Sequence, residues 1–157
     1  MNMEICNAFL ESTVDILKEM AEIKALPEGD YNFEDNEINI RGVCSLISFD
    51  GKFKGRLLID MEWETALAIV KNTVGIQYEL ENKMPILSAV AEFNNTIAGD
   101  AVTNINNKYG YGLRLSSPAA LAGRDVLICL DKIQSCSVVC NTSVGDIKLS
   151  MAFEWEE

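Results

Sequence analysis

Residues 88–99 read SAVAEFNNTIAG and form the centre of a long amphipathic segment. Its apolar side chains recur at the three- and four-residue spacing of one helix face. They are Ile86, Val90, Ile97 and Ala101, with Leu87, Ala91, Ala98 and Ile105 widening the stripe. At roughly 100° per residue, four residues fall within an arc of about 60° on the opposite side. We call these four the polar row: Ser88, Glu92, Asn95 and Gly99. The pattern predicts a helix over residues 82–108 whose polar row faces away from the core.

The chain around this helix switches between helical and strand periods. Helices are predicted over residues 3–24 and 62–75, where apolar positions follow the helical spacing. One strand is predicted from residues 38–40 together with 43–49, and others over 53–61, 113–115, 126–133, 138–142 and 147–155. Residues 119–124 are predicted to be a loop or short turn. Strands joined by tight turns such as Asp50-Gly51, with helices grouped between them, predict one α+β domain over residues 1–157. We expect a mainly antiparallel sheet packed against a few helices, including the long one.

Helix ends are marked by capping residues. Asp60 is expected to cap the helix over residues 62–75, and Asn82 is expected to cap the long helix, with Pro85 tolerated in its first turn. The glycines that follow Tyr109 are expected to stop the long helix. These signals leave the polar row in the middle of the helix.

Net charge limits the class of partner. The 157 residues include 13 Lys+Arg and 24 Asp+Glu, which gives a formal net charge of -11. That field repels phosphate backbones and anionic lipid, so neither nucleic acid nor a membrane is expected as a partner. A phosphorylated protein stays open, because a local site can oppose the global field. No apolar run approaches the ~20 residues that span a bilayer. Residues 1–4 lack the features of a signal peptide, so we expect a cytoplasmic protein.

Histidine is absent from the sequence, and this excludes several kinds of catalytic site. Without histidine there is no Ser-His-Asp or Cys-His catalysis and no histidine-ligated zinc. The five cysteines form no CxxC motif, and we expect them to be reduced and mostly buried thiols. Any chemistry must therefore use carboxylates, amides and hydroxyls.

The polar row by itself has two interpretations. A carboxylate and an amide three residues apart are most often an ordinary solvated helix face. However, Asn94 and Asn95 each cost helix propensity, and Gly99 costs about 1 kcal/mol more than alanine in mid-helix. Gly99 indicates either close packing against a neighbouring helix or clearance for the backbone of a partner. On pattern alone, an ordinary surface and a binding face both stay open.

A resemblance favours the binding face. Ser88-x-x-x-Glu92-x-x-Asn95, followed after 22 residues by Pro118, resembles the active-site signature of the CheC/CheX/FliY phosphatases of bacterial chemotaxis. The neighbouring residues 99–101 and 115–118 also look like this family. The signature helix occurs once in the chain, which is similar to CheX, whereas CheC carries the signature twice.

The resemblance implies hydrolysis of the aspartyl phosphate on a CheY-like response regulator. In this family the residue matching Asn95 orients the attacking water, and the residue matching Glu92 pairs with a lysine of the regulator. Ser88 and Pro118 would support the site. Mg²⁺ would be held by the regulator, so the resemblance implies no metal site in this chain. The resemblance also implies a homodimer joined through the sheet, for which the alternating residues 147–155 offer an edge. Two alternatives stay open: a catalytically silent CheX-like module that binds a regulator or other signalling protein, and a structural subunit comparable to the flagellar switch proteins.

Overall fold

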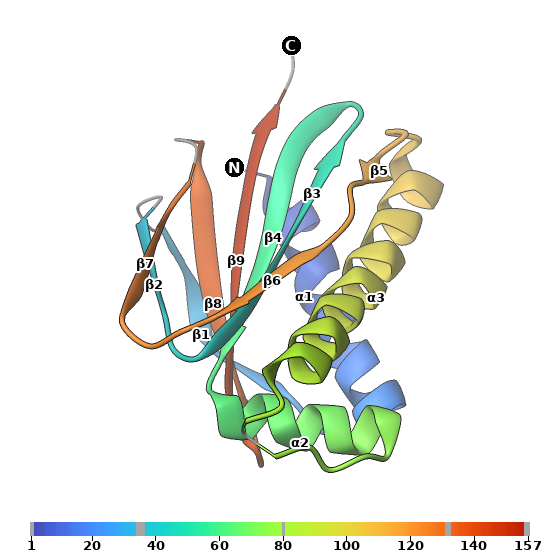
Figure 1. The fold of residues 1–157 in the computed structure, drawn as a ribbon. Coiled ribbons are helices and arrows are strands. Elements are labelled where there is room, and N and C mark those ends of the chain that lie inside the picture. The colour runs from blue at the N-terminus through green and yellow to red at the C-terminus, as the bar shows by residue number, and fades with distance from the viewer. Residues whose placement is uncertain (1, 34–36, 80, 131–132, 156–157) are drawn as a thin grey trace.

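A seven-stranded sheet with helices packed on one of its faces makes up most of the computed structural model (Figure 1). The structure describes residues 2–33, 37–79, 81–130 and 133–155. Three helices lie within these ranges: α1 (Met3–Ala21), α2 (Trp63–Val74) and α3 (Lys83–Tyr109). The α+β class is confirmed, and each helix lies within a few residues of its predicted range. Of the helices described, none is long and apolar enough to cross a membrane.

The sheet is antiparallel between every pair of neighbouring strands. Its strands are β1 (Leu26–Phe33), β3 (Val43–Asp50), β4 (Phe53–Met61), β5 (Arg114–Leu115), β6 (Ala119–Ala122), β8 (Ser135–Thr142) and β9 (Gly145–Trp155). They lie in the order β1-β8-β9-β4-β3-β5, and β6 also pairs with β3. A separate two-stranded ribbon joins β2 (Glu37–Ile40) to β7 (Val126–Cys129). Ile38 and Ile40 of this ribbon pack against Cys44 and Leu58 in a second, smaller apolar cluster.

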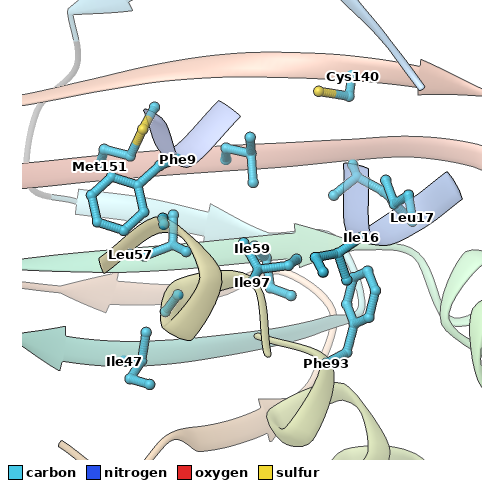
Figure 2. Close-up of a cluster of buried hydrophobic side chains, with 14 of the residues drawn as sticks. Phe9, Ile16, Leu17, Ile47, Leu57, Ile59, Phe93, Ile97, Cys140 and Met151 are labelled. Atoms are coloured by element: carbon cyan, nitrogen blue, oxygen red, sulfur yellow. The ribbon is translucent and has the colours of Figure 1, made fainter. Parts of the chain in front are cut away.

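The main core lies between the sheet and the helices α1 and α3. The apolar stripe of α3 is buried as its spacing predicts, with Ile86, Val90, Ile97, Ala101 and Ile105 at most 1% exposed. Figure 2 shows side chains of α3, α1 and the central strands meeting in this core. Each large aliphatic side chain buried here contributes roughly 1.5–3 kcal/mol. Core packing therefore decides which side of α3 faces the solvent.

Hydrogen bonds at its C-terminal end hold α3 in place. Asn82 occupies the N-cap position as predicted, but its side chain makes no capping hydrogen bond. At the other end Gly110 adopts a left-handed conformation with φ 68°, which ends the helix. The amide of Asn106 accepts a bond from the Leu113 backbone N–H and donates one to the Leu113 carbonyl, at 2.8 and 3.0 Å. These bonds tie the end of α3 to the chain that returns to the sheet.

Two strand predictions near the middle of the chain are wrong. Residues 38–49 form two strands rather than one, because the chain bends at Arg41-Gly42 and β2 leaves the sheet to pair with β7. Residues 119–122, predicted as a loop, form β6 against β3. The strand predicted over residues 126–133 ends at Cys129, and residues 131–132 lie outside the described ranges.

Strand β1 is missing from the sequence prediction. Pro27 and Gly29 indicate a chain break, yet they lie within β1, which pairs only with β8. An edge strand tolerates proline because one of its sides needs no ladder hydrogen bonds. Pairing with β8 determines this strand, and that pairing cannot be read from residues 26–33 alone.

The edge expected for dimerisation is also misplaced. Residues 147–155 belong to a strand as predicted, but β9 lies inside the sheet and is paired on both sides, with β4 and with β8. It therefore offers no free ladder of hydrogen bonds to a second copy. The homodimer stays a prediction, without β9 as its interface.

Asp60 does not cap α2 as expected. It lies in β4 with 0% exposure, and its carboxylate accepts hydrogen bonds from the Arg41 backbone N–H at 3.0 and 3.3 Å. Glu62 takes the N-cap position of α2 without a side-chain bond. Burial raises the pKa of Asp60 from 3.8 to about 6, although the Arg41 amide and charge and the neighbouring Lys148 lower it. The burial of this carboxyl group therefore outweighs its partners.

The thiols are mostly buried, as expected. None of the five cysteines forms a disulfide bond, and Cys129 alone is exposed. The sulfur atoms of Cys6 and Cys136 lie 3.5 Å apart between α1 and β8. This hydrogen bond and burial raise the pKa of Cys6 far above its usual value, and burial raises that of Cys140 to about 11. These groups stay protonated and act as small apolar side chains.

Asp60→Asn is expected to stabilise the fold in a pH-dependent way. Below pH 3.8 the carboxyl group is protonated in both states, whereas up to about pH 6 the unfolded chain releases the proton more readily. The wild type therefore loses stability over this range, and asparagine keeps an acceptor for Arg41 without titrating. By pH 7 the variant should exceed the wild type by roughly 1–3 kcal/mol more than at low pH. Urea unfolding of both proteins at acid and neutral pH measures this, and a difference independent of pH would contradict it.

Candidate functional site

The polar row lies along the side of α3 opposite its buried stripe. Ser88 and Glu92 are exposed, and Asn95 and Gly99 are partly exposed. All four lie within the 27 residues of a single uninterrupted helix. Helix α3 runs beside β6 in Figure 1, and Pro118 directly precedes β6 in the sequence. A site on such a helix is held more rigidly than one on a loop.

The carboxylate of Glu92 and the amide of Asn95 have no partners within the part of the chain that the structure describes. Among the described residues, none forms a hydrogen bond or an ion pair with either side chain. The Thr96 hydroxyl group donates to the backbone carbonyl oxygen of Glu92 at 2.9 Å, so it bonds to the helix and leaves the carboxylate free. A carboxylate can accept from a cation, and an amide can both donate to and accept from a water molecule. Both groups are available to a ligand or a partner protein.

Gly99 faces open space. A Cβ atom built at this position would meet nothing within 4 Å, and the backbone is helical. Close packing against a neighbouring helix is therefore wrong as an explanation of this glycine. The second interpretation, clearance for the backbone of a partner, is consistent with an open position beside Asn95.

Pro118 lies in the loop between β5 and β6. Both of these strands pair with β3, so the loop is attached to the sheet on both sides. The hydroxyl group of Ser116 accepts from the Ser48 backbone N–H at 3.0 Å and donates to the Ser48 carbonyl at 3.1 Å. These bonds fix the loop that contains the half-buried Pro118. The proline therefore restricts a loop already anchored on β3.

A buried hydrogen-bond chain connects this loop to α3. Asn94 is 0% exposed and donates through its side-chain nitrogen to the Ser45 hydroxyl oxygen at 3.1 Å. Ser45, on β3, donates in turn to the backbone carbonyl of Ala119 at 2.8 Å. Sequence reasoning missed this contact. The sequence did contain a signal for it. Asn94 falls at a position of the buried apolar stripe, and it is the only polar residue among the buried residues of α3.

Other features of the surface do not join this site. A cavity of about 750 Å³ is lined by residues that include Lys54, Arg56 and Arg114, and by none of the polar row. Within the described ranges, no three side chains of His, Cys, Asp or Glu lie close enough together to hold a metal ion. The site thus consists of a free carboxylate and a free amide on a rigid helix. Such groups serve a reaction that needs positioning rather than a strong base.

Comparisons with known proteins point to one family. The family model described as "Chemotaxis phosphatase CheX" matches residues 43–142, which include the polar row and Pro118. A solved CheC-like superfamily protein from Shewanella sp. PV-4 is 27% identical, with a TM-score of 0.86, covering 98% of this chain and 99% of that one. No curated protein matches the chain.

Two further solved structures share the fold. The chemotaxis protein CheX from Desulfovibrio desulfuricans is 22% identical with a TM-score of 0.85, covering 96% of this chain and 99% of that one. The CheX in a CheX-CheY-BeF3-Mg²⁺ complex from Borrelia burgdorferi is 23% identical with a TM-score of 0.78, covering 95% and 97%. The fold therefore extends over nearly the whole of all three chains.

Gly99→Ala is expected to stabilise the isolated protein. The added methyl group meets no neighbour, and alanine is favoured over glycine in a helix interior by about 1 kcal/mol. The free energy of unfolding in urea should rise by that amount. As a matched control, Gly55→Ala should destabilise the protein, because its Cβ would lie 2.6 Å from the Ala152 carbonyl oxygen. A loss of stability in Gly99→Ala would mean that the position is packed after all.

Proposed function

The chain belongs to the CheX family of chemotaxis phosphatases, and on that premise we propose that it hydrolyses the aspartyl phosphate of a CheY-like response regulator. Asn95 enters the active site of the regulator and orients a water molecule for in-line attack on phosphorus. Glu92 pairs with a lysine of the regulator and holds the two proteins in register. Ser88 and Pro118 support the helix face and the adjoining loop, and Gly99 leaves room for the regulator's backbone.

One observation carries this proposal: Glu92 and Asn95 lie on one exposed side of a rigid helix, and no described residue forms a hydrogen bond or ion pair with either side chain. An acyl phosphate is already activated, so its hydrolysis depends mainly on the position of the water and on charge stabilisation. An amide can supply that position without a histidine. Mg²⁺ would be held by the regulator. The Borrelia relative, in which CheX is complexed with CheY, BeF3 and Mg²⁺, supports a regulator as the partner.

The alternative is a catalytically silent module that binds a regulator or other signalling protein through the same face. An exposed carboxylate would serve such binding equally well. The free amide of Asn95 favours the phosphatase, since binding alone does not require a group that orients water. A structural subunit is the third possibility, and it predicts neither regulator binding nor phosphate release.

Asn95→Ala is expected to abolish catalysis while leaving binding intact. Loss of the orienting amide should lower kcat by about a hundredfold or more, with affinity for the regulator unchanged. The assay loads response regulators with a small phosphodonor and follows phosphate release with and without this protein. Asn107→Ala, the same change at an exposed position on the same helix, should retain full activity. A regulator that binds but loses phosphate only at its intrinsic rate would establish the silent module.

Glu92→Gln is expected to act on binding. The change keeps the size of the side chain and removes the charge that pairs with the regulator's lysine, so Kd should rise roughly tenfold and depend less on salt. Titration calorimetry at two salt concentrations measures both effects. Glu64→Gln, at an exposed position on α2, is the matched control and should leave Kd unchanged. An equal response in both variants would argue against a specific ion pair.

A further inference from the structure

The hydrogen bonds from Asn94 to Ser45 and from Ser45 to Ala119 connect three separate parts of the fold. Asn94 lies on α3, Ser45 on β3 and Ala119 at the start of β6. At each end, the bonded residue is the immediate neighbour of a signature residue, because Asn94 precedes Asn95 and Ala119 follows Pro118. Asn94 and Ser45 are 0% exposed. The chain is therefore an internal bridge between the two parts of the signature.

The direction of each bond in this bridge follows from chemistry. A backbone carbonyl only accepts, so the Ser45 hydroxyl group must give its single proton to Ala119. Ser45 can then only accept from Asn94, and the side-chain NH₂ of Asn94 must face it. The Oδ1 atom of Asn94 is left in the core without a partner among the described residues. A buried polar atom without a partner costs stability, so an apolar residue of similar size would suit the core better.

We propose that Asn94 is a positioning residue that sets the orientation of Asn95 relative to the Pro118 loop through the Ser45 bridge. This inference rests on the proposed function, because it concerns how that site is held. Apolar packing alone permits small rotations and shifts of a helix on a sheet, whereas a hydrogen bond of defined length restricts them. Neighbouring side chains on a helix differ by about 100° in direction, so fixing Asn94 also fixes the direction in which Asn95 leaves the helix.

The proposed reaction is sensitive to such a restraint. Catalysis by positioning is lost steeply when the orienting group moves, with an error of about 1 Å costing up to about a hundredfold in rate. Binding of the regulator is more tolerant, since it spreads over a whole surface. The bridge should therefore affect kcat and leave the affinity for the regulator unchanged.

The test separates stability from catalysis. Asn94→Leu fills the same space without a polar atom, so its free energy of unfolding should equal or exceed that of the wild type. Its kcat for phosphate release should fall about tenfold, with KM unchanged. Ser45→Ala removes the middle of the bridge and should lower kcat to a similar extent. The double variant should be no worse than either single one, because all three variants lack the hydrogen bond between Asn94 and Ser45.

Thr65→Val is the matched control. The Thr65 hydroxyl group is also buried and donates to a backbone carbonyl of another segment, that of Val144 at 2.9 Å, but neither segment contains a signature residue. This variant should lose stability and keep the kcat of the wild type. Amide hydrogen exchange should increase over residues 91–99 and 116–120 in Asn94→Leu and in Ser45→Ala, and stay unchanged there in Thr65→Val.

Each outcome decides a separate question. An active wild type with an Asn94→Leu variant of unchanged kcat would overturn the bridge and leave the phosphatase standing. If the loss of activity in Asn94→Leu follows only from a lower stability, as in any damaged core, the bridge would also be overturned. A wild type that releases no phosphate from any regulator would overturn the proposed function. Hydrogen exchange would then still decide whether Asn94 couples the helix to the loop.

Discussion

The packing of α3 on the sheet is the constraint on which the site depends. Its buried stripe contributes roughly 1.5–3 kcal/mol for each large side chain, while Gly99 and the two asparagines cost about 0.5–1 kcal/mol each in helix propensity. The helix can therefore carry these unfavourable residues without loss of structure. Turning α3 to bury the polar row would place the Glu92 carboxylate in an apolar core, at a cost of several kcal/mol. The contacts that bury the apolar stripe therefore keep the polar row exposed to solvent.

The sequence predicted those parts of the fold whose information is local. The helical spacing from Ile86 to Ile105 gave the helix and its exposed side, and Asp50-Gly51 with its flanking strands gave the hairpin of β3 and β4. Strands held by distant partners were missed or misjudged. Pro27 and Gly29 resemble a break, but Pro27 pairs with Cys140 of β8 and Gly29 lies in the register shift that follows Glu28; residues 119–122 become a strand because β3 is beside them. Asp60 resembles a cap, but the bend at Arg41 brings it a different donor.

In the candidate site, too, the local features were readable from the sequence and the long-range contacts were not. The positions of Ser88, Glu92, Asn95 and Gly99 on one side of a helix follow from period alone, and their proposed roles come from the resemblance of the signature. The inward direction of Asn94 was also readable from period, since it falls between Val90 and Ala98 on the buried side. Its partner was not readable, because Ser45 lies 49 residues away and its bond to Ala119 joins three elements. Supporting contacts of this kind appear only when the sheet is assembled.

The net negative charge of the chain is compatible with the proposed docking of a regulator, because salt screens most of that charge. At physiological salt the Debye length is about 8 Å, so most of the net charge of -11 is screened from a partner docked at the row. The interactions that remain are local, and they favour a cation opposite Glu92. An amide carries no charge, so Asn95 can approach a phosphoryl group without the repulsion that a carboxylate would meet there. In the proposed function, the charge of the polar row therefore serves recognition and its neutral group serves the reacting centre. That division requires the two side chains to keep a fixed relation to each other, which a rigid helix provides.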